Sequence, residues 1–513
     1  MKKILFSVVC LLLMTTNLMA QIRTTHRIEL PVKDGFTSEQ KHLFGKNGLV
    51  QTSRSEKSNN GERIFRFVVF DESLREKSVQ EFNYPKNMSV FNIVKEQNKL
   101  FVLFVISNSK TDFILLSFDI LTEKMTNVSG NFIEKFRIGY SNLINSADND
   151  FNMLVNGDNV YISGAVKKVP TVCIIDSKSG DVNDFDMTID GVKPKKVKIL
   201  NAEVLPESQE VVYYVMHSYR KKIAEITAKI YTLEGKLKTS IVLNENGEHK
   251  ISRIAGVNLS ENEYAFSGTY GSSYYVTTNV GMCYFRSVNG DIKVSQYFNF
   301  LDFQNYLKFL PEKVQDKINK QKERKEARGK ELTYTTGVIT HPLKITKDGI
   351  VMLMECFYPT YRTVTTYSNG RMSTSQVFDG YKYTHGVMVS ISDEGKVLWD
   401  NIFELALNHK PYFPRTFITV NEDISKEINM VYSTGLNIYK KSISLNGQAK
   451  SVEEKKIDIT DKEGDKVKSS YSNVEHWYDN YFLMYGVQSI KNSERDENGK
   501  KVREVIFMNK IEF

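Results

Sequence analysis

One kind of segment recurs along the chain and limits what the chain can fold into. Each copy has an apolar run, a polar turn that often contains Gly, and a second, weaker alternating run, as in GVMVSISDEGKVLWDNIF at residues 386–403. Gly, Asn and Asp supply the positive φ angles that a tight turn requires, so each copy predicts a β-hairpin. Successive turn glycines are separated by 55, 55, 105 and 52 residues; they are Gly180, Gly235, Gly290, Gly395 and Gly447.

Hairpins repeated at this spacing predict an all-β chain that folds as a β-propeller with about four strands in each blade. Further turns near Arg75 and Glu123 extend the series, which gives seven or eight blades. The segments KLFVLFVIS and NVYISGA are continuous apolar runs, as expected of inner strands that are buried on both faces. The last hairpin supplies too few strands for a blade, so we expect the N-terminal segment QIRTTHRIEL, residues 21–30, to add the outer strand that closes the ring.

The C-terminus also fits an alternative architecture, an outer-membrane β-barrel. Val505, Phe507, Ile511 and Phe513 alternate along the last segment, as residues of a terminal barrel strand do. Transmembrane strands, however, alternate apolar and polar residues over about ten positions. The runs in this chain are shorter and often apolar on both faces, and their turns recur at blade spacing, which favours the propeller.

The N-terminus predicts export. Lys2 and Lys3 precede a short apolar run that ends at Ala20, which is the pattern of a secretory signal peptide covering residues 1–20. The run is too short to span a bilayer as a helix, so we expect no transmembrane span after cleavage. Residues 21–513 would then form the propeller in the periplasm or at the cell surface. Three cysteines remain, each in an apolar run and expected to be buried rather than paired: Cys173, Cys283 and Cys356.

The 105-residue gap between turns predicts that one blade carries an insertion, at residues 301–333. Phe303, Leu307 and Leu310 recur at helical spacing, and Pro311 is expected to divide the segment into two helices. Residues 312–330 hold eight Lys or Arg against four Asp or Glu. Two interpretations stay open. The insertion is either an arm that docks a partner or an anionic envelope surface, or a solvated helical loop whose apolar stripe caps the propeller.

Two segments combine aromatic residues with Ser, Thr and Arg: a Tyr-rich hairpin at residues 355–386 and the stretch SGTYGSSYYVTT at 267–278. Rigid rings with polar neighbours suit sugar stacking or protein-binding hot spots. Strands also favour Tyr, Phe and Thr for packing alone, so burial is the competing explanation. The candidate binding residues are Tyr270, Tyr274, Tyr275, Tyr358, Tyr361, Arg362, Tyr367, Tyr381, Tyr383 and His385.

No motif for catalysis or for a metal is present. The segment at 386–403 is not an Asp-box, because Ile391 occupies the Ser position and three residues separate Gly395 from Trp399. There is no GxSxG, HExxH, P-loop or EF-hand, and the eight His are isolated, so we expect no metal and no cofactor. The formal charge is +8, or +6 without the two N-terminal lysines, and forms no long basic stripe, which argues against nucleic acid.

The chain resembles exported, propeller-like proteins of Bacteroidota with quinoprotein- or WD-like blade hairpins. The signal peptide ending at Ala20-Gln21, the helical insertion and the segment GYKYTHGVMVSISDEGKVLWD carry the resemblance. It implies export and no particular activity. In quinoprotein propellers an Asp, a turn Gly and a later Trp recur in most blades. Only one blade here has the Trp, which argues against a quinone cofactor.

Two hypotheses about function follow. The first is a non-enzymatic binding or scaffold protein of the cell envelope that docks a protein or glycan through a propeller face and the insertion. The alternative is a propeller glycosidase or lyase acting on polysaccharide. The alternative predicts a cluster of Asp, Glu, Arg or His at one mouth of the central channel, with Glu355 and Asp379 as the carboxylates that flank the Tyr-rich segment. A propeller fold is compatible with both.

Overall fold

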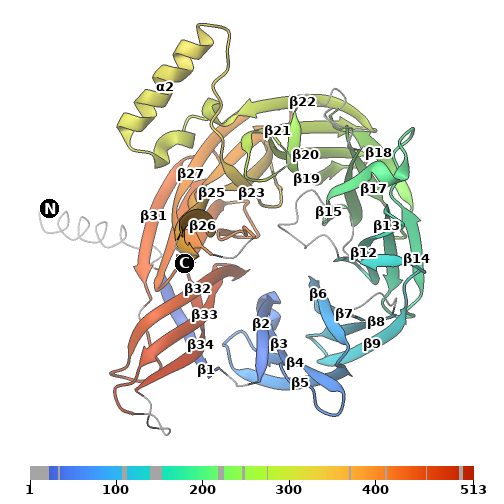
Figure 1. Ribbon diagram of the computed structural model, residues 1–513, viewed down its shortest axis with the longest axis vertical. Coiled ribbons are helices and arrows are strands. Elements are labelled where there is room, and N and C mark those ends of the chain that lie inside the picture. The colour runs from blue at the N-terminus through green and yellow to red at the C-terminus, as the bar shows by residue number, and fades with distance from the viewer. Residues whose placement is uncertain are drawn as a thin grey trace, which may run out of the picture.

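The computed structural model describes residues 22–32, 35–106, 112–138, 153–217, 225–244, 249–273, 275–368, 371–410, 413–457, 459–495, 499 and 501–513. In these residues the strands form eight separate antiparallel sheets of four or five strands. The sheets are arranged as blades around a central axis (Figure 1), so the chain is an eight-bladed β-propeller. The prediction of seven or eight blades is confirmed. The alternative architecture, an outer-membrane β-barrel, would require one closed sheet, and the described strands do not form one.

The blades follow one another in chain order. Blade 1 contains β2 (Phe36–Leu43), β3 (Leu49–Ser55), β4 (Glu62–Phe70) and β5 (Glu76–Pro85), with the 3₁₀ helix η2 (Gly45–Asn47) after β2. Blade 2 contains β6 (Met88–Glu96), β7 (Lys99–Ile106), β8 (Asp112–Asp119) and β9 (Lys124–Asn131). Blade 3 contains β10 (Phe136–Ile138), β11 (Met153–Asn156), β12 (Asn159–Val166), β13 (Val169–Asp176) and β14 (Val182–Asp186). Blade 4 follows η4 (Pro194–Lys196) and contains β15 (Val197–Leu205), β16 (Glu210–His217), β17 (Ile226–Tyr231) and β18 (Leu237–Val242).

The second half continues the same pattern. Blade 5 contains β19 (Lys250–Ser260), β20 (Glu263–Gly271), β21 (Asn279–Val288) and β22 (Asp291–Asn299). Blade 6 contains β23 (Gly337–Thr340), β24 (Lys344–Thr346), β25 (Gly349–Ser368), β26 (Arg371–Ser392) and β27 (Val397–His409). Blade 7 contains β28 (Thr419–Val420), β29 (Glu427–Thr434), β30 (Asn437–Ser444) and β31 (Ala449–Lys456). Blade 8 contains β32 (Lys466–Tyr478), β33 (Tyr481–Lys491), β34 (Val502–Glu512) and β1 (Arg23–Pro31).

The ring is closed by the N-terminal strand, as the sequence predicts. β1 pairs antiparallel with β34, from Arg23 opposite Glu512 to Pro31 opposite Val505. Ion pairs stabilise the pairing of β1 with β34. The Glu29 carboxylate on β1 accepts hydrogen bonds from Arg27 on the same strand and from Arg503 on β34, each at 2.7 Å. The two ends of the chain therefore build one blade together.

The recurring hairpins are the third and fourth strands of the blades, and their glycines serve two purposes. Gly447 has a φ of +82°, and a Cβ added to it would lie 2.3 Å from Cγ of Trp399 in the preceding blade. Gly235 has a φ of +76° and a Cβ there would meet Ile174 at 2.3 Å. Trp399 also donates from Nε1 to the Leu445 carbonyl at 2.9 Å. These turns therefore need glycine both for conformation and for contact with the neighbouring blade.

Gly447→Ala tests the contact between this turn and the neighbouring blade. We expect it to lower the free energy of unfolding by about 2–4 kcal/mol, since a methyl group at this turn must displace the Trp399 ring. Gly191→Ala is the matched control, because Gly191 has a φ of +73° with nothing within 4 Å and should lose only about 1 kcal/mol. Denaturant midpoints measure both, and equal losses would contradict the contact between blades.

The insertion differs in part from its prediction. Before Pro311 the chain forms two short 3₁₀ helices, η5 (Phe300–Asp302) and η6 (Tyr306–Phe309), where a longer helix is predicted. Phe303 and Leu307, two of the residues at helical spacing, pack into the core beside blades 5 and 6. After Pro311 comes the predicted helix, α2 (Glu312–Glu326).

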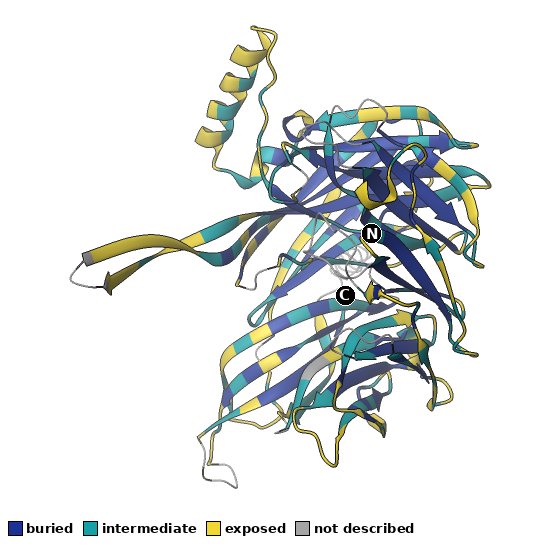
Figure 2. Cartoon of the chain, turned by 45° about the vertical axis from the view of Figure 1, so that its right-hand side comes forward, coloured by how far each residue is buried: buried dark blue, intermediate teal, exposed yellow. Residues whose placement is uncertain are grey.

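Helix α2 stands away from the rim of the propeller (Figures 1 and 2), and none of its residues is buried. Lys322, in the C-terminal half of α2, connects it to η5, because its Nζ donates to the Leu301 carbonyl at 2.8 Å and to Asp302 Oδ1 at 2.9 Å. The helix therefore does not cap the propeller with an apolar stripe. No helix in the described part of the chain is long and apolar enough to cross a membrane.

The core lies between neighbouring blades, where apolar side chains from two sheets interdigitate. At the seam of the ring, Trp477 and Leu483 of blade 8 pack with Leu49 and Phe70 of blade 1. The three cysteines of the described chain are buried and unpaired, as predicted. Residues 1–20, predicted to be a signal peptide, lie outside the described residues.

Candidate functional site

Blade 6 carries a two-stranded ribbon that extends beyond the propeller. β25 has 20 residues and β26 has 22, but β25 pairs with β23 only as far as Phe357, and β26 pairs with β27 only from Tyr381 onward. In the described structure, residues 358–368 pair only with β26 and residues 371–379 pair only with β25, and we call these two segments the ribbon. Figure 2 shows it projecting from the body. None of its described side chains is buried.

Aromatic rings anchor the ribbon where it leaves the blade. Strand register places Phe357 opposite Tyr383 and Tyr361 opposite Phe378, on one face of the two strands. Phe357 lies 5.2 Å from Tyr381, and Tyr381 lies 5.0 Å from Phe378, measured between ring centroids. This row of contacts fixes the direction in which the ribbon leaves the blade.

Apolar side chains are exposed along the ribbon, from Tyr361 near its root to Tyr367 and Met372 near its tip. Tyr361, Tyr367 and Met372 lie on the same face of the ribbon as the anchoring rings. Tyr367 and Met372 are opposite each other and are 78% and 64% exposed, while Tyr361 is 58% exposed. Large apolar groups at this exposure are characteristic of binding surfaces when they gather on one element.

The ribbon is nearly uncharged. Residues 358–379 contain two Arg, one Asp and no Glu, and many Ser and Thr. Arg362 lies beside Asp379, with 3.8 Å between Nε and Oδ1. On both outer edges of the ribbon the backbone N–H and C=O groups pair with no other described strand. Such edges can accept another strand, and exposed rings can cover it.

The structure divides the candidate residues taken from the sequence. Tyr358, Tyr361, Arg362 and Tyr367 are exposed on the ribbon, and Tyr381 is half-buried at its root. The others are not brought into this surface: Tyr383 and His385 are buried in blade 6, Tyr270 is buried in blade 5, Tyr275 is exposed on the turn after β20, and Tyr274 lies outside the described residues.

Tyr383 and His385, the two candidate residues buried in blade 6, make contacts that connect the blade to neighbouring segments. His385 stacks on Phe309 with 3.9 Å between ring centroids, which joins η6 to the blade, and burial lowers the pKa of His385 to about 3. The Tyr383 hydroxyl donates to the Arg415 carbonyl at 2.6 Å and accepts from the Arg415 N–H at 2.9 Å. Tyr383 therefore positions the backbone of a loop between β27 and β28.

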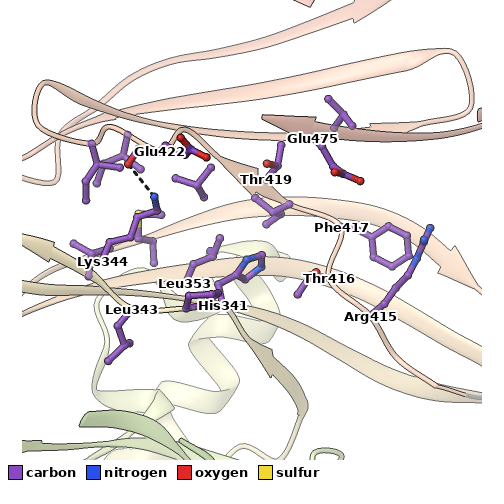
Figure 3. A pocket seen from close by; sticks show the side chains of 18 of the residues that line it. His341, Leu343, Lys344, Leu353, Arg415, Thr416, Phe417, Thr419, Glu422 and Glu475 are labelled. Atoms are coloured by element: carbon purple, nitrogen blue, oxygen red, sulfur yellow. Dashed lines mark hydrogen bonds between the residues drawn. The ribbon is translucent and has the colours of Figure 1, made fainter. Parts of the chain in front are cut away.

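That loop borders a cavity of about 930 Å³ on the inner strands of blades 6, 7 and 8 (Figure 3). Its titratable lining includes His341, Lys344, Arg415, Glu475 and Tyr485. Sequence reasoning missed these residues, because they come from separate elements and share no spacing. The cluster has the residue types that the enzymatic alternative requires. In the described chain, no three His, Cys, Asp or Glu side chains are placed to hold a metal ion.

No family model matches the chain, and no curated protein matches its sequence. Similar solved structures include the polysaccharide lyase Uly1, at 9% identity and a TM-score of 0.37, covering 96% of this chain and 99% of that one. A Dos1 propeller has 8% identity and a TM-score of 0.39, covering 96% and 95%. The quinohemoprotein alcohol dehydrogenase ADHIIG from Pseudomonas putida HK5 has 8% identity and a TM-score of 0.42, covering 95% and 76%.

Proposed function

We propose that this chain is an exported binding scaffold whose ribbon docks a partner protein. The partner adds an extended segment to an edge of the ribbon and buries the rings of Tyr361 and Tyr367. One observation carries the proposal: the two strands of the ribbon project from the blade with both edges unpaired among the described strands and with apolar side chains exposed. The N-terminal signal pattern supports export.

The chemistry of the ribbon supports a protein partner. An isolated two-stranded hairpin is marginally stable in water, and a third strand stabilises it. Soluble proteins commonly protect such edges with charges or Pro, but the ribbon has only two Arg, one Asp and a single Pro, Pro359, at its root. A strand added to an edge satisfies backbone groups that a glycan would leave open, and Tyr rings are frequent hot spots in protein interfaces.

Helix α2 supplies a second surface of different character. Residues 312–330 carry eight Lys or Arg against four Asp or Glu, and no residue of α2 is buried. We assign to it a contact with the anionic envelope surface, which would orient the ribbon towards its partner. The two roles are separable, because α2 and the ribbon are distinct elements.

The triple variant Tyr361→Ser, Tyr367→Ser, Met372→Ser tests the ribbon. A tagged full-length chain in native cells should recover its partner at least about tenfold less with the variant, since exposed anchors of this kind contribute about 2 kcal/mol or more each. The fold should be unaffected, because all three side chains are exposed. Val452→Ser is the control: Val452 is 68% exposed on β31, away from the ribbon. Equal recovery by all three chains would contradict the proposal.

The enzymatic alternative has one observation in its favour, the titratable groups around the cavity. Tyr485 donates from its hydroxyl to Glu475, and burial raises the pKa of Glu475. A carboxyl group that holds its proton more tightly beside a phenol is suited to proton transfer. Release of new sugar ends from a polysaccharide by the wild type, and not by Glu475→Gln, would favour this function without affecting the role of the ribbon.

A further inference from the structure

The cavity has one apolar side. Buried aliphatic side chains form it, from β25, β26, β29 and the loops around β28: Val351, Leu353, Met388, Ile418, Ile424 and Ile428. These residues belong to the core between blades 6 and 7. A volume of about 930 Å³ is at the upper end of the range for small organic ligands, and such sites combine apolar walls with a few placed polar groups.

The positively charged side chain of Arg415 lies at one end of the cavity, on a loop whose backbone is fixed by hydrogen bonds (Figure 3). Arg415 begins the segment 415–418, whose backbone is held by a single buried carboxylate. Glu355 is 0% exposed, and its Oε1 accepts from the N–H groups of Phe417 and Ile418, each at 2.8 Å. The same oxygen contacts His341 Nε2 at 2.8 Å. Together with the Tyr383 hydroxyl, these contacts fix Arg415 in place before any ligand arrives.

The guanidinium of Arg415 is bound by neutral acceptors. Its Nη2 donates to Asn473 Oδ1 at 2.7 Å and to the Tyr471 hydroxyl, and the group lies 4.6 Å from the centroid of the Phe417 ring. Arg415 forms no ion pair with any residue that the structure describes. Its Nη1 group donates no hydrogen bond to that part of the chain either. Both N–H groups of Nη2 are therefore used, and the N–H groups of Nη1 can donate to the carboxylate of a ligand, the acceptor that a guanidinium favours.

The opposite end of the cavity offers a weaker attraction for anions. Lys344 donates from Nζ to the backbone carbonyls of Asn421 and Glu422, at 3.0 Å and 3.1 Å (Figure 3). Glu422 is exposed at this end. The fixed positive charge at Arg415 therefore determines where the charged group of a ligand binds, and the aliphatic side determines where its apolar part lies.

We propose that this cavity binds an organic acid with an apolar body, its carboxylate on Arg415 and its body along the aliphatic side formed by residues such as Leu353 and Ile418. The ligand is a small amphipathic carboxylate, such as a fatty acid or an acyl-bearing acid. The site lies on the inner strands of the propeller and is independent of the ribbon, so either assignment can fail without the other.

Dodecanoate below its micelle concentration and dodecanol below its solubility limit test the site on the full-length chain by isothermal titration calorimetry. We expect dodecanoate to bind about 10- to 100-fold more tightly, which is the effect of hydrogen bonds to a charged group. Arg415→Gln should abolish this preference and leave dodecanol binding unchanged. Glu422→Gln, which changes an exposed carboxylate at the other end, should keep the preference.

A second variant keeps the test valid if Arg415→Gln does not fold. Val420→Trp fills the cavity from β28 without touching Arg415, and it should weaken both ligands at least tenfold. Equal affinities for the two ligands, or an unchanged preference in Arg415→Gln, would overturn the assignment of the carboxylate. Tighter binding of an oligogalacturonate than of dodecanoate, or binding of neither alkyl ligand, would contradict the proposal that the ligand has an apolar body.

Discussion

Deletion of residues 22–31 is expected to abolish the cooperative unfolding transition of the propeller. The deletion removes β1, so β34 becomes an unprotected edge along the whole register from Arg23–Glu512 to Pro31–Val505. It also exposes the apolar partners of Ile22 in blades 7 and 8 and those of Ile28 and Leu30 in blades 8 and 1. Three such side chains contribute about 5 kcal/mol or more, which approaches the total stability of about 5–15 kcal/mol of a typical domain.

Calorimetry of the deleted chain and the intact chain, with light scattering, measures this loss. A synthetic peptide of residues 22–32 is the control, because it can restore the missing strand from outside. We expect the peptide to return the transition in a saturable manner and to suppress aggregation. A deleted chain that melts within about 2 °C of the intact one would show that the ring does not depend on its N-terminal strand.

Glu355→Ala is expected to have the second largest effect. The substitution leaves the N–H groups of Phe417 and Ile418 and the His341 ring without their shared acceptor inside the protein. Each buried group left unsatisfied costs about 1–3 kcal/mol, so we expect a loss of about 3–5 kcal/mol. Because this carboxylate also fixes the loop that carries Arg415, dodecanoate affinity should fall together with stability.

Chemical denaturation and the same titration measure both effects. Glu422→Ala is the matched control, since Glu422 is an exposed carboxylate on the same cavity and should change stability by no more than about 0.5 kcal/mol. Glu355→Gln should fall between them, because it keeps one carbonyl acceptor. If Glu355→Ala were as stable as the control, the buried carboxylate would not be what holds residues 415–418.

The architecture could be predicted because its signals are local. A tight turn needs Gly at positions such as Gly235 and Gly447, and the same glycines contact the preceding blade, so their spacing reports the repeat of the fold. The N-terminal strand could be predicted because the last hairpin lacks a partner. The prediction of a longer helix before Pro311 is wrong, since 3₁₀ turns can present apolar residues such as Phe303 and Leu307 at similar spacing.

The site could be predicted only in part, because exposure depends on neighbouring strands. Phe357 and Tyr361 lie on the same face of β25, but β23 pairs with β25 only as far as Phe357. Exposure therefore changes within four residues at the point where the neighbouring strands end. The cavity gave no sequence signal, since His341, Arg415 and Glu475 come together only through the closed ring of blades.

The central claim is that the ribbon docks a partner protein, and site-specific photo-cross-linking tests it most directly. A benzophenone amino acid replaces Tyr367, which is 78% exposed near the tip, and the same residue at Val452 serves as the reference position. Irradiation of native cells should give one dominant protein adduct from position 367, and position 452 should not give this adduct. Identical adduct patterns at the two positions, or no protein adduct at 367, would contradict the claim.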